Sequence, residues 1–355
     1  MTTLDTAHRS AIQLTGVAQA AAQVFENAMP LTPWLPPRRN PTLTYSFNAS
    51  GLQPIDVAEY RAFDTPAPYG QLGQRITKEG HLPPISRKLP ISEYQELQWA
   101  NRLDQLGDLM DEYAARLGVA VAARVERARA EALLTGKVSL DENNLRAVID
   151  YGRDPALSVA LPAAAKRWTA ETATPIEDLI RFRALVKDKS KGSLPTVLVL
   201  TNKIMNHLQT NREIIGFALN RTNDLPGRVS TEDVITVIAG FARLTRVVIA
   251  DDAYASYNFG TLGGSVFPDN KILLLPPPGA VLVEGGGSLG TTDYGVTAES
   301  INPDYGIPQA EQSGIFGGAF SHPDPEGIDV LVSAVALPLV QGANATLAAD
   351  VIAEA

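Results

Sequence analysis

Residues 101–134 read NRLDQLGDLMDEYAARLGVAVAARVERARAEALL, and this stretch decides the fold. Its apolar residues recur every three or four positions, which predicts a continuous amphipathic helix. The apolar stripe consists of Leu106, Met110, Tyr113, Leu117, Val121 and Val125. The other face carries charged residues, among them Glu126 and Arg129. Extended back to Ser92, the helix would be roughly 60 Å long at about 1.5 Å per residue. A helix of that length is a spine rather than part of a compact globule.

The region before this helix is rich in proline and aromatic residues. Eleven of the 25 prolines lie within residues 1–90, so this region cannot be mainly helical, although Thr6 to Ala28 has helical spacing. Leu43, Tyr45 and Phe47 alternate with polar residues, which predicts a strand, and a second strand is expected near residues 71–89. A two-stranded excursion is marginal in water by itself. We therefore expect it to lie on a neighbouring subunit.

The region after Leu134 changes character. Short apolar strands alternate with short helices, which favours an α/β region. The expected strands are Thr196–Leu200, Arg246–Ala250 and Ile272–Leu275. A glycine-rich irregular stretch follows, and then an apolar strand or strand pair over Asp329–Val340 and a small polar tail.

The composition excludes several classes of protein. The chain has 355 residues, no cysteine and a formal net charge of −9. Without cysteine there is no disulfide framework, no thiolate metal site and no cysteine nucleophile. The acidic balance argues against a nucleic-acid-binding surface, since such affinity comes mainly from lysine and arginine. The longest apolar stretch is too short to span a bilayer and the N-terminus has no secretory pattern, so a cytoplasmic address is expected.

Two motifs resemble catalytic or nucleotide-binding signatures. The stretch GGGSLG over residues 285–290 fits both a dinucleotide loop and the nucleophile elbow of a hydrolase with Ser288 as the nucleophile. Both motifs require a helix directly afterwards, and the following residues are poor helix formers, so we expect a glycine turn. Asp251 and Asp252 follow a predicted strand, where an α/β enzyme would hold Mg²⁺, although solvated acids at a turn are the commoner case. No metal site, cofactor site or catalytic residue is therefore predicted.

The order of the parts, together with three short passages, resembles the major capsid proteins of tailed bacteriophages. The resemblance is strongest to the lambda-like major head protein group, the capsid protein E type. The first passage is Leu133–Lys137 leading to Asp150–Arg153. The second is Phe267–Lys271 followed by Tyr294-Gly295, and the third is Ser333–Leu339.

The resemblance implies an α+β chain with the HK97-type capsid fold. Its expected parts are an N-terminal arm (1–41), an extended β excursion or E-loop (42–90), a peripheral domain with the spine helix (91–157), an α/β axial domain (158–310), a return to the peripheral domain (311–340) and a C-terminal tail (341–355). Because the excursion begins by about Thr42, there is no room for an N-terminal scaffolding domain, and a separate scaffold protein is expected.

The resemblance also implies a structural function without a cofactor. The chain would assemble with itself into hexamers and pentamers of an icosahedral phage head around double-stranded DNA, which it contacts weakly. Further expected partners are a scaffold protein, a portal protein and, as is frequent in this family, a decoration protein, with no membrane. The expected location is the virion, with assembly in the host cytoplasm. The alternatives are an encapsulin-like compartment and a cytoplasmic α/β hydrolase that uses Ser288.

The intersubunit contacts are expected along the excursion and the N-terminal arm, because these segments carry aromatic and basic side chains. The candidate contact residues are Trp34, Tyr45, Phe47, Tyr60, Phe63, Tyr69, Arg75, Lys78, Arg87 and Lys88.

Overall fold

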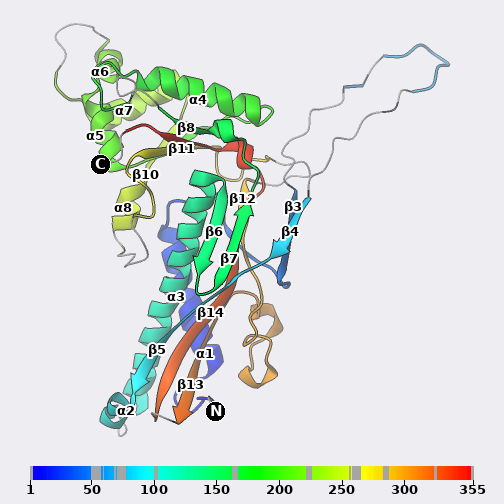
Figure 1. The fold of residues 1–355 in the computed structure, drawn as a ribbon, viewed down its shortest axis with the longest axis vertical. Coiled ribbons are helices and arrows are strands. Elements are labelled where there is room, and N and C mark those ends of the chain that lie inside the picture. Colours follow the sequence, from blue (N-terminus) through cyan, green and yellow to red (C-terminus); the bar gives the residue numbers. More distant parts are fainter. Residues whose placement is uncertain are drawn as a thin grey trace.

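The structure is a computed structural model. It describes residues 3–48, 57–58, 60–67, 69, 77–99, 103–161, 167–220, 226–255, 257, 265–282, 288–323 and 326–352. The chain forms an elongated body with a spine helix along its long axis, an α/β layer at one end and a loop that projects to one side (Figure 1).

The spine is α3 (Leu103–Thr135), a helix of 33 residues that is about 50 Å long. A shorter helix, α2 (Glu93–Trp99), precedes it, so the single helix predicted from Ser92 is described as two, with residues 100–102 outside the described part. The predicted stripe is confirmed: five of its six members are buried, and Tyr113 packs partly buried against the same core.

Helix α1 (Ala11–Ala28) lies beside α3. It begins later than Thr6 because the side chain of Ser10 accepts a hydrogen bond from the backbone N–H of Gln13 and so caps the helix. The two helices approach closely at Gly118, where an added Cβ would come within 2.4 Å of the carbonyl oxygen of Ala18. Gly118 weakens helix propensity, but it permits this contact.

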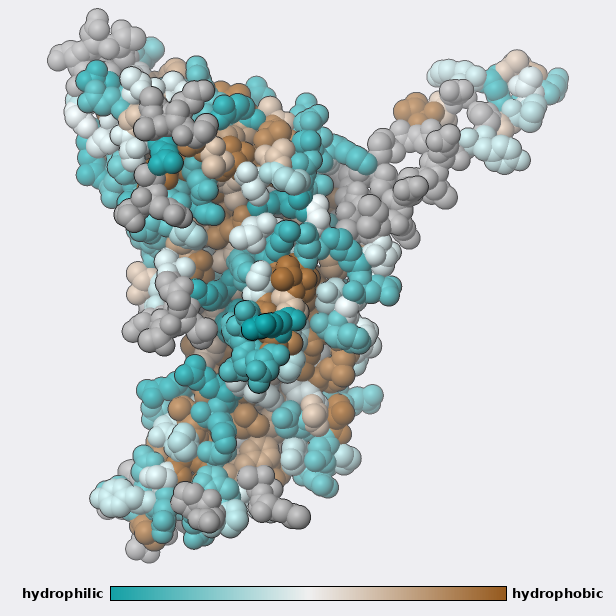
Figure 2. Space-filling view, viewed as in Figure 1, coloured by the Kyte–Doolittle hydropathy of each residue, from teal (hydrophilic) through white to brown (hydrophobic). Residues whose placement is uncertain are grey.

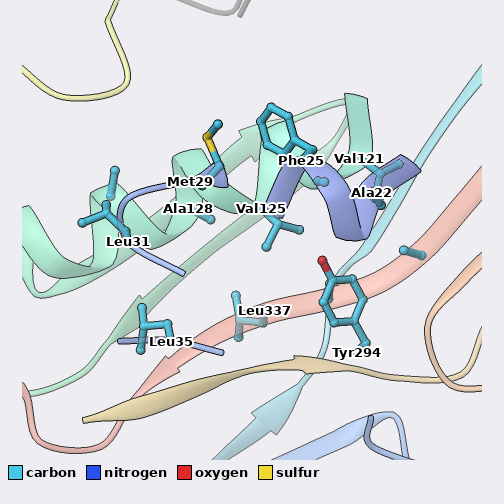
Figure 3. Packing of buried hydrophobic residues seen from close by; sticks show 14 of the residues in the cluster. Ala22, Phe25, Met29, Leu31, Leu35, Val121, Val125, Ala128, Tyr294 and Leu337 are labelled. Carbon is cyan, nitrogen blue, oxygen red and sulfur yellow. The ribbon is translucent and has the colours of Figure 1, made fainter. Parts of the chain in front are cut away.

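The two helices cover a six-stranded sheet built around β14 (Glu326–Val340), a strand of 15 residues. β13 (Ile315–Pro323) and β5 (Pro84–Ser92) pair with the first part of β14, and β12 (Gly290–Tyr294) pairs with its end, all antiparallel. The remaining strands are β1 (Thr3–Leu4) on β13 and β2 (Pro37–Arg39) on β12. Figure 3 shows how Phe25, Val121, Val125 and Leu337 fill the space between helices and strands.

The α/β layer contains a five-stranded sheet in the order β10-β9-β11-β15-β8 and a second apolar core. The strands are β8 (Ser158–Ala160), β9 (Val197–Leu200), β10 (Arg246–Ile249), β11 (Lys271–Leu275) and β15 (Leu347–Asp350). The helices are α4 (Pro175–Lys189), α5 (Asn202–Thr210), α6 (Arg212–Leu219), α7 (Thr231–Val237), which continues as a π-helical turn over Ile238–Ala242, and α8 (Ala250–Ala255). Short 3₁₀ turns lie at Pro155–Leu157, Pro303–Tyr305, Gln309–Glu311 and Ala343–Ala345.

Two strands belong to a different sheet from the one that the expected domain boundaries imply. β12 lies within the expected axial segment 158–310 but hydrogen-bonds to β14 in the six-stranded sheet. β15 lies in the expected polar tail 341–355 but is a buried central strand that pairs with β11 and β8. Both differences arise from strand pairing between residues far apart in the sequence.

Two strand pairs complete the fold. β6 (Lys137–Glu142) and β7 (Leu145–Asp150) form a hairpin whose turn residues, Asn143 and Asn144, have φ angles of 46° and 67°. Asparagine tolerates this left-handed conformation, which two-residue hairpin turns favour. β3 (Thr44–Asn48) pairs with β4 (Thr77–His81), which confirms the strand predicted at Tyr45 and Phe47 and forms the base of the projecting loop.

Candidate functional site

The base of the projecting loop is fixed to the body by aromatic side chains. Tyr45 and Phe47 stack with ring centroids 6.0 Å apart, and Phe47 packs on Tyr151 at 5.9 Å. The hydroxyl of Tyr151 donates a hydrogen bond to the carbonyl of Pro338 in β14. Opposite Tyr45 in the register is Gly80, where a Cβ would overlap the tyrosine ring. The strand pair is therefore held rigidly where it leaves the body.

The loop tip, defined as the described residues 57–58, 60–67 and 69, has the opposite character. Tyr60, Phe63 and Tyr69 are 108%, 98% and 102% exposed, so their rings do not pack against the part of the chain that the structure describes. A turn at Ala62–Thr65 shapes the tip: the backbone N–H and the hydroxyl of Thr65 both donate to the carbonyl of Ala62. Figures 1 and 2 show the tip well away from the body, with apolar and polar residues side by side. Three fully exposed rings on one short segment indicate a surface that a partner covers.

The structure separates the predicted contact residues into groups. Trp34 is 1% exposed and donates its indole N–H to the carbonyl of Pro276 at 2.7 Å, so it belongs to the chain's own core. Tyr45 and Phe47 are also buried within the chain. We therefore withdraw these three residues from the expected contact surface.

The predicted basic contact residues also differ in whether they bind to their own chain. The ammonium of Lys78 donates to the carbonyl of Asp150 at 2.6 Å, and that of Lys88 pairs with Asp329 at 2.5 Å, so both contact their own chain. Arg87 is exposed on β5, and Arg75 lies outside the described residues. Because the side chain of Lys88 stays 63% exposed, the candidates that remain on the described surface are the three rings of the loop tip, Arg87 and Lys88.

A buried ionic cluster joins the N-terminal segment to the spine helix. The guanidinium of Arg129, which is fully buried, lies 2.6 Å from a carboxylate oxygen of Glu26 and 3.3 Å from one of Glu126. Its other N–H groups donate to the hydroxyls of Thr32 and Thr292. Tyr254 and Tyr294 donate to Glu126 and Glu26 at 3.0 and 2.9 Å. The ring of Tyr294 is visible beneath α1 in Figure 3.

Sequence patterning missed this cluster because Glu126 and Arg129 were assigned to the charged face of the helix. A signal was present, since Arg129 lies four residues after Val125 and so continues the spacing of the apolar stripe. Only the position of Glu26 on α1, about a hundred residues away, explains why a charge is tolerated there.

Burial and the neighbouring charges shift the ionisation of the cluster. Burial raises the pKa of Glu126 above its ordinary value, and the opposing effects of Arg129 and of the hydrogen bond from Tyr254 do not cancel it. Burial by itself would lower the pKa of Arg129, but Glu126 and Glu26 outweigh it, so that pKa is raised. Two carboxylates share one guanidinium, and burial disfavours the charged form of Glu126.

This shift predicts a pH dependence of stability. A carboxyl group whose pKa is raised on folding stabilises the chain fully below its unfolded-state pKa, and this contribution is lost as the pH rises through the folded-state pKa. We expect the free energy of unfolding of the wild-type protein, relative to Glu126→Gln, to be greater near pH 4.5 than at pH 7. Urea unfolding of both proteins measures it. Glu112→Gln, at an exposed position, serves as the control. If the free energy of unfolding of the wild type exceeds that of Glu126→Gln by no more at pH 4.5 than at pH 7, the raised pKa of Glu126 is contradicted.

The apparent catalytic motifs have structural roles. The hydroxyl of Ser288 donates to the carbonyl of Gly290 at 3.2 Å, and Gly290 begins strand β12 rather than a helix. A nucleophile elbow and a dinucleotide loop both need a helix there, so this arrangement is incompatible with either. Asp251 and Asp252 accept hydrogen bonds from the backbone and side-chain amides of Asn202 at 2.6 and 2.8 Å, which tie α8 to the start of α5. Within the described residues, no group of three or more metal-ligating side chains gathers, and no helix could span a membrane.

We expect Ser288→Ala to leave shell formation unchanged, because within the described residues the hydrogen bond of its hydroxyl is a short-range one beside its own strand. The yield of assembled particles, measured by sedimentation, should match that of the wild type. A hydrolysis assay with simple esters run in parallel should show no activity that depends on Ser288. Ester turnover by the wild type that Ser288→Ala abolishes would support the hydrolase alternative instead.

The match to a known protein family supports the structural interpretation. The family described as phage major capsid protein E matches residues 53–351, which is most of the chain. The chain belongs to the phage major capsid protein E family. As a capsid protein it assembles with copies of itself into a shell and is located in the phage head. No curated protein matches this chain.

Solved structures confirm the HK97-type fold of this capsid protein. A protein assigned as the capsid protein of a prophage in E. coli CFT073 superposes with a TM-score of 0.57 at 14% identity, over 94% of this chain and 99% of that chain. A phage-related protein from Bordetella bronchiseptica RB50 has a TM-score of 0.54 at 13% identity, over 94% and 96%. A chain of the procapsid of satellite phage P4 has a TM-score of 0.51 at 9% identity, over 94% and 90%. At these identities the likeness concerns the fold alone.

Proposed function

We propose that this capsid protein forms hexamers and pentamers of an icosahedral head that encloses double-stranded DNA, and that the projecting loop lies on a neighbouring subunit. The observation that carries the proposal is the contrast within the loop. Its base is packed rigidly into the body by Tyr45 and Phe47, whereas its tip exposes three aromatic rings completely. Exposed rings on such an arm do not stabilise an isolated chain. In a closed shell, however, the binding free energies of many identical contacts add up.

The charge of the chain fits a container for DNA. With a net charge of −9, the chain offers little attraction to a polyanion, so packaged DNA would be contacted weakly and could move during filling. A scaffold protein and a portal protein complete the proposed assembly, with a decoration protein as an optional partner, and assembly takes place in the host cytoplasm. The proposed role is structural and requires no catalysis or cofactor.

Negative-stain electron microscopy of the expressed protein, with a sedimentation run beside it, tests the proposal. We expect closed shells, rings of five or six, or tubes, either from the protein alone or after co-expression with its scaffold. A monomer or dimer in both conditions would overturn the proposal. The contents of the shells distinguish the alternative: packaged DNA supports a phage head, whereas an enclosed enzyme would indicate an encapsulin-like compartment.

A further inference from the structure

The outward face of helix α1 carries no charge. Its exposed residues are small, aliphatic or amide-bearing, and Ile12 and Val24 are 44% and 68% exposed. Glu26, the only charged residue of the helix, is buried in the ionic cluster. A helix at a protein surface normally presents charged residues to water, whereas the centre of a protein–protein interface is depleted of them. The face therefore has the composition of an interface.

Helix α3 extends this face beside α1. The two helices run parallel, because Ala18 lies at Gly118 and Glu26 lies at Arg129. Over the 18 residues of α1, the pair of helices presents a surface about 27 Å long and about 20 Å wide. Two such surfaces packed together would bury about 1,100 Å² in total, whereas a specific interface needs about 1,000 Å². The surface is therefore large enough for a contact with one partner.

The charges on the outward side of α3 are divided between the two halves of the helix. Asp108 and Glu112 lie in the first half, and Arg116 and Arg127 lie in the second. Their spacings are close to whole helical turns, so the four side chains share one side of the helix. The side chains of Asp108, Glu112 and Arg116 are 76%, 63% and 70% exposed. The surface is thus negative toward one end and positive toward the other.

We propose that α1 and α3 of one copy pack antiparallel on the same two helices of a second copy, about a two-fold axis. In this arrangement Asp108 and Glu112 of each copy face Arg127 and Arg116 of the other, and each charge pair occurs twice. The uncharged face of α1 is covered by the same face of the second copy. This inference rests on the proposed function, because an icosahedral shell contains two-fold axes at which a self-complementary surface can join copies.

The position of the axis follows from the charges. Exchanging the acidic and basic halves of α3 requires an axis near the level of Arg116. In α1 this level corresponds to Gly16, because Ala18 lies at Gly118. An added Cβ at Gly16 would meet no atom within 4 Å, so the backbone is open to a partner. Two α1 helices can therefore approach closely where they cross.

Single cysteine variants test the proposal, because the chain has no cysteine of its own. In Gly16→Cys the thiol lies at the axis beside the same thiol of the second copy, in open space that lets the variant fold. Asn27→Cys is the matched control on the same face, where antiparallel packing places the two thiols about 33 Å apart. A disulfide requires Cα atoms within about 7 Å. After mild oxidation of shells, we expect covalent dimers and nothing larger for Gly16→Cys, and no dimers for Asn27→Cys.

A charge reversal in the Gly16→Cys background checks the antiparallel orientation. Glu112→Arg places like charges opposite Arg116 of the second copy at two symmetry-related positions. We expect the cross-linked fraction to fall about threefold or more. Adding Arg116→Glu brings opposite charges together again and should restore the cross-linking. A fall that Arg116→Glu does not reverse would contradict the proposed pairing.

The outcomes distinguish this inference from the proposed function. Shells that form without Gly16→Cys dimers overturn the inference and leave the proposed function intact, as do equal yields of dimer from Gly16→Cys and Asn27→Cys. A Gly16→Cys thiol that shells protect from a maleimide without forming dimers shows that another protein, such as the scaffold, covers α1, which also overturns the inference. If the wild type forms no shells with its scaffold, the proposed function fails and the inference fails with it.

A second variant keeps the test decisive if Gly16→Cys does not assemble. Ala20→Cys lies one turn from the axis, so the two thiols of an antiparallel pair are about 12 Å apart. A bismaleimide of that reach should join the two copies in shells of Ala20→Cys and leave Asn27→Cys unjoined. Absence of the Ala20→Cys product from assembled shells overturns the inference.

Discussion

We expect a variant that lacks residues 51–70 to fold and to form no closed shells. The fold should survive because the rings of Tyr60, Phe63 and Tyr69 do not pack on any described part of their own chain, while β3 and β4 remain paired and packed on Tyr151. Assembly should fail because each ring can bury about 150–250 Å² on a partner. At about 25 cal/mol per Å², that contributes up to about 4–6 kcal/mol per ring before the entropic costs of association.

Circular dichroism and thermal melting measure whether the deletion variant is folded, and sedimentation with electron microscopy measures shells. A triple variant, Tyr60→Ser with Phe63→Ser and Tyr69→Ser, serves as the matched test, because it removes only the rings and leaves the length of the loop unchanged. We expect it to lose shells as well. Closed shells from the deletion variant at the wild-type yield would show that the loop is not an intersubunit arm.

The second large effect is expected at the buried ionic cluster. Arg129→Met removes the positive charge and leaves Glu26 and Glu126 facing each other without it. Breaking a buried ion pair from one side costs about 3–5 kcal/mol, because the remaining charge stays buried and uncompensated. We expect a loss of this size in the free energy of unfolding, measured by urea denaturation, and fewer assembled particles as a result.

Two further variants show whether the cost arises from the unpaired charges. Arg116→Met lies on the same helix, but its ion pair with Glu112 is long, at 3.8 Å, and largely exposed, so the expected loss is at most about 1 kcal/mol. Combining Arg129→Met with Glu26→Gln and Glu126→Gln should recover part of the lost stability, since no uncompensated charge remains. If Arg129→Met unfolds within about 1 kcal/mol of the wild type, the cluster does not hold the N-terminal segment to the spine.

The helices and most strands could be predicted from the sequence because their signals are local. The stripe from Leu106 to Val125 repeats within one helix, and the alternation around Tyr45 lies within one strand. The sheet partners could not be predicted in this way. β15 joins the α/β sheet through hydrogen bonds to β11, more than seventy residues earlier, and no pattern inside residues 347–350 specifies that pairing.

The contact surface shows the same division between local and distant information. Composition alone identified an aromatic-rich excursion that needs a partner, and Tyr60, Phe63 and Tyr69 remain candidates on that basis. Trp34, Tyr45 and Phe47 have the same chemistry, yet they are buried against residues of other segments, such as Pro276 and Tyr151. Periodicity and composition are properties of neighbouring residues, so they were enough to predict a long amphipathic spine and an arm rich in aromatic rings. Which rings are exposed and which charges are buried could be read from the folded chain alone, because burial depends on the segments that the fold brings together from distant parts of the sequence.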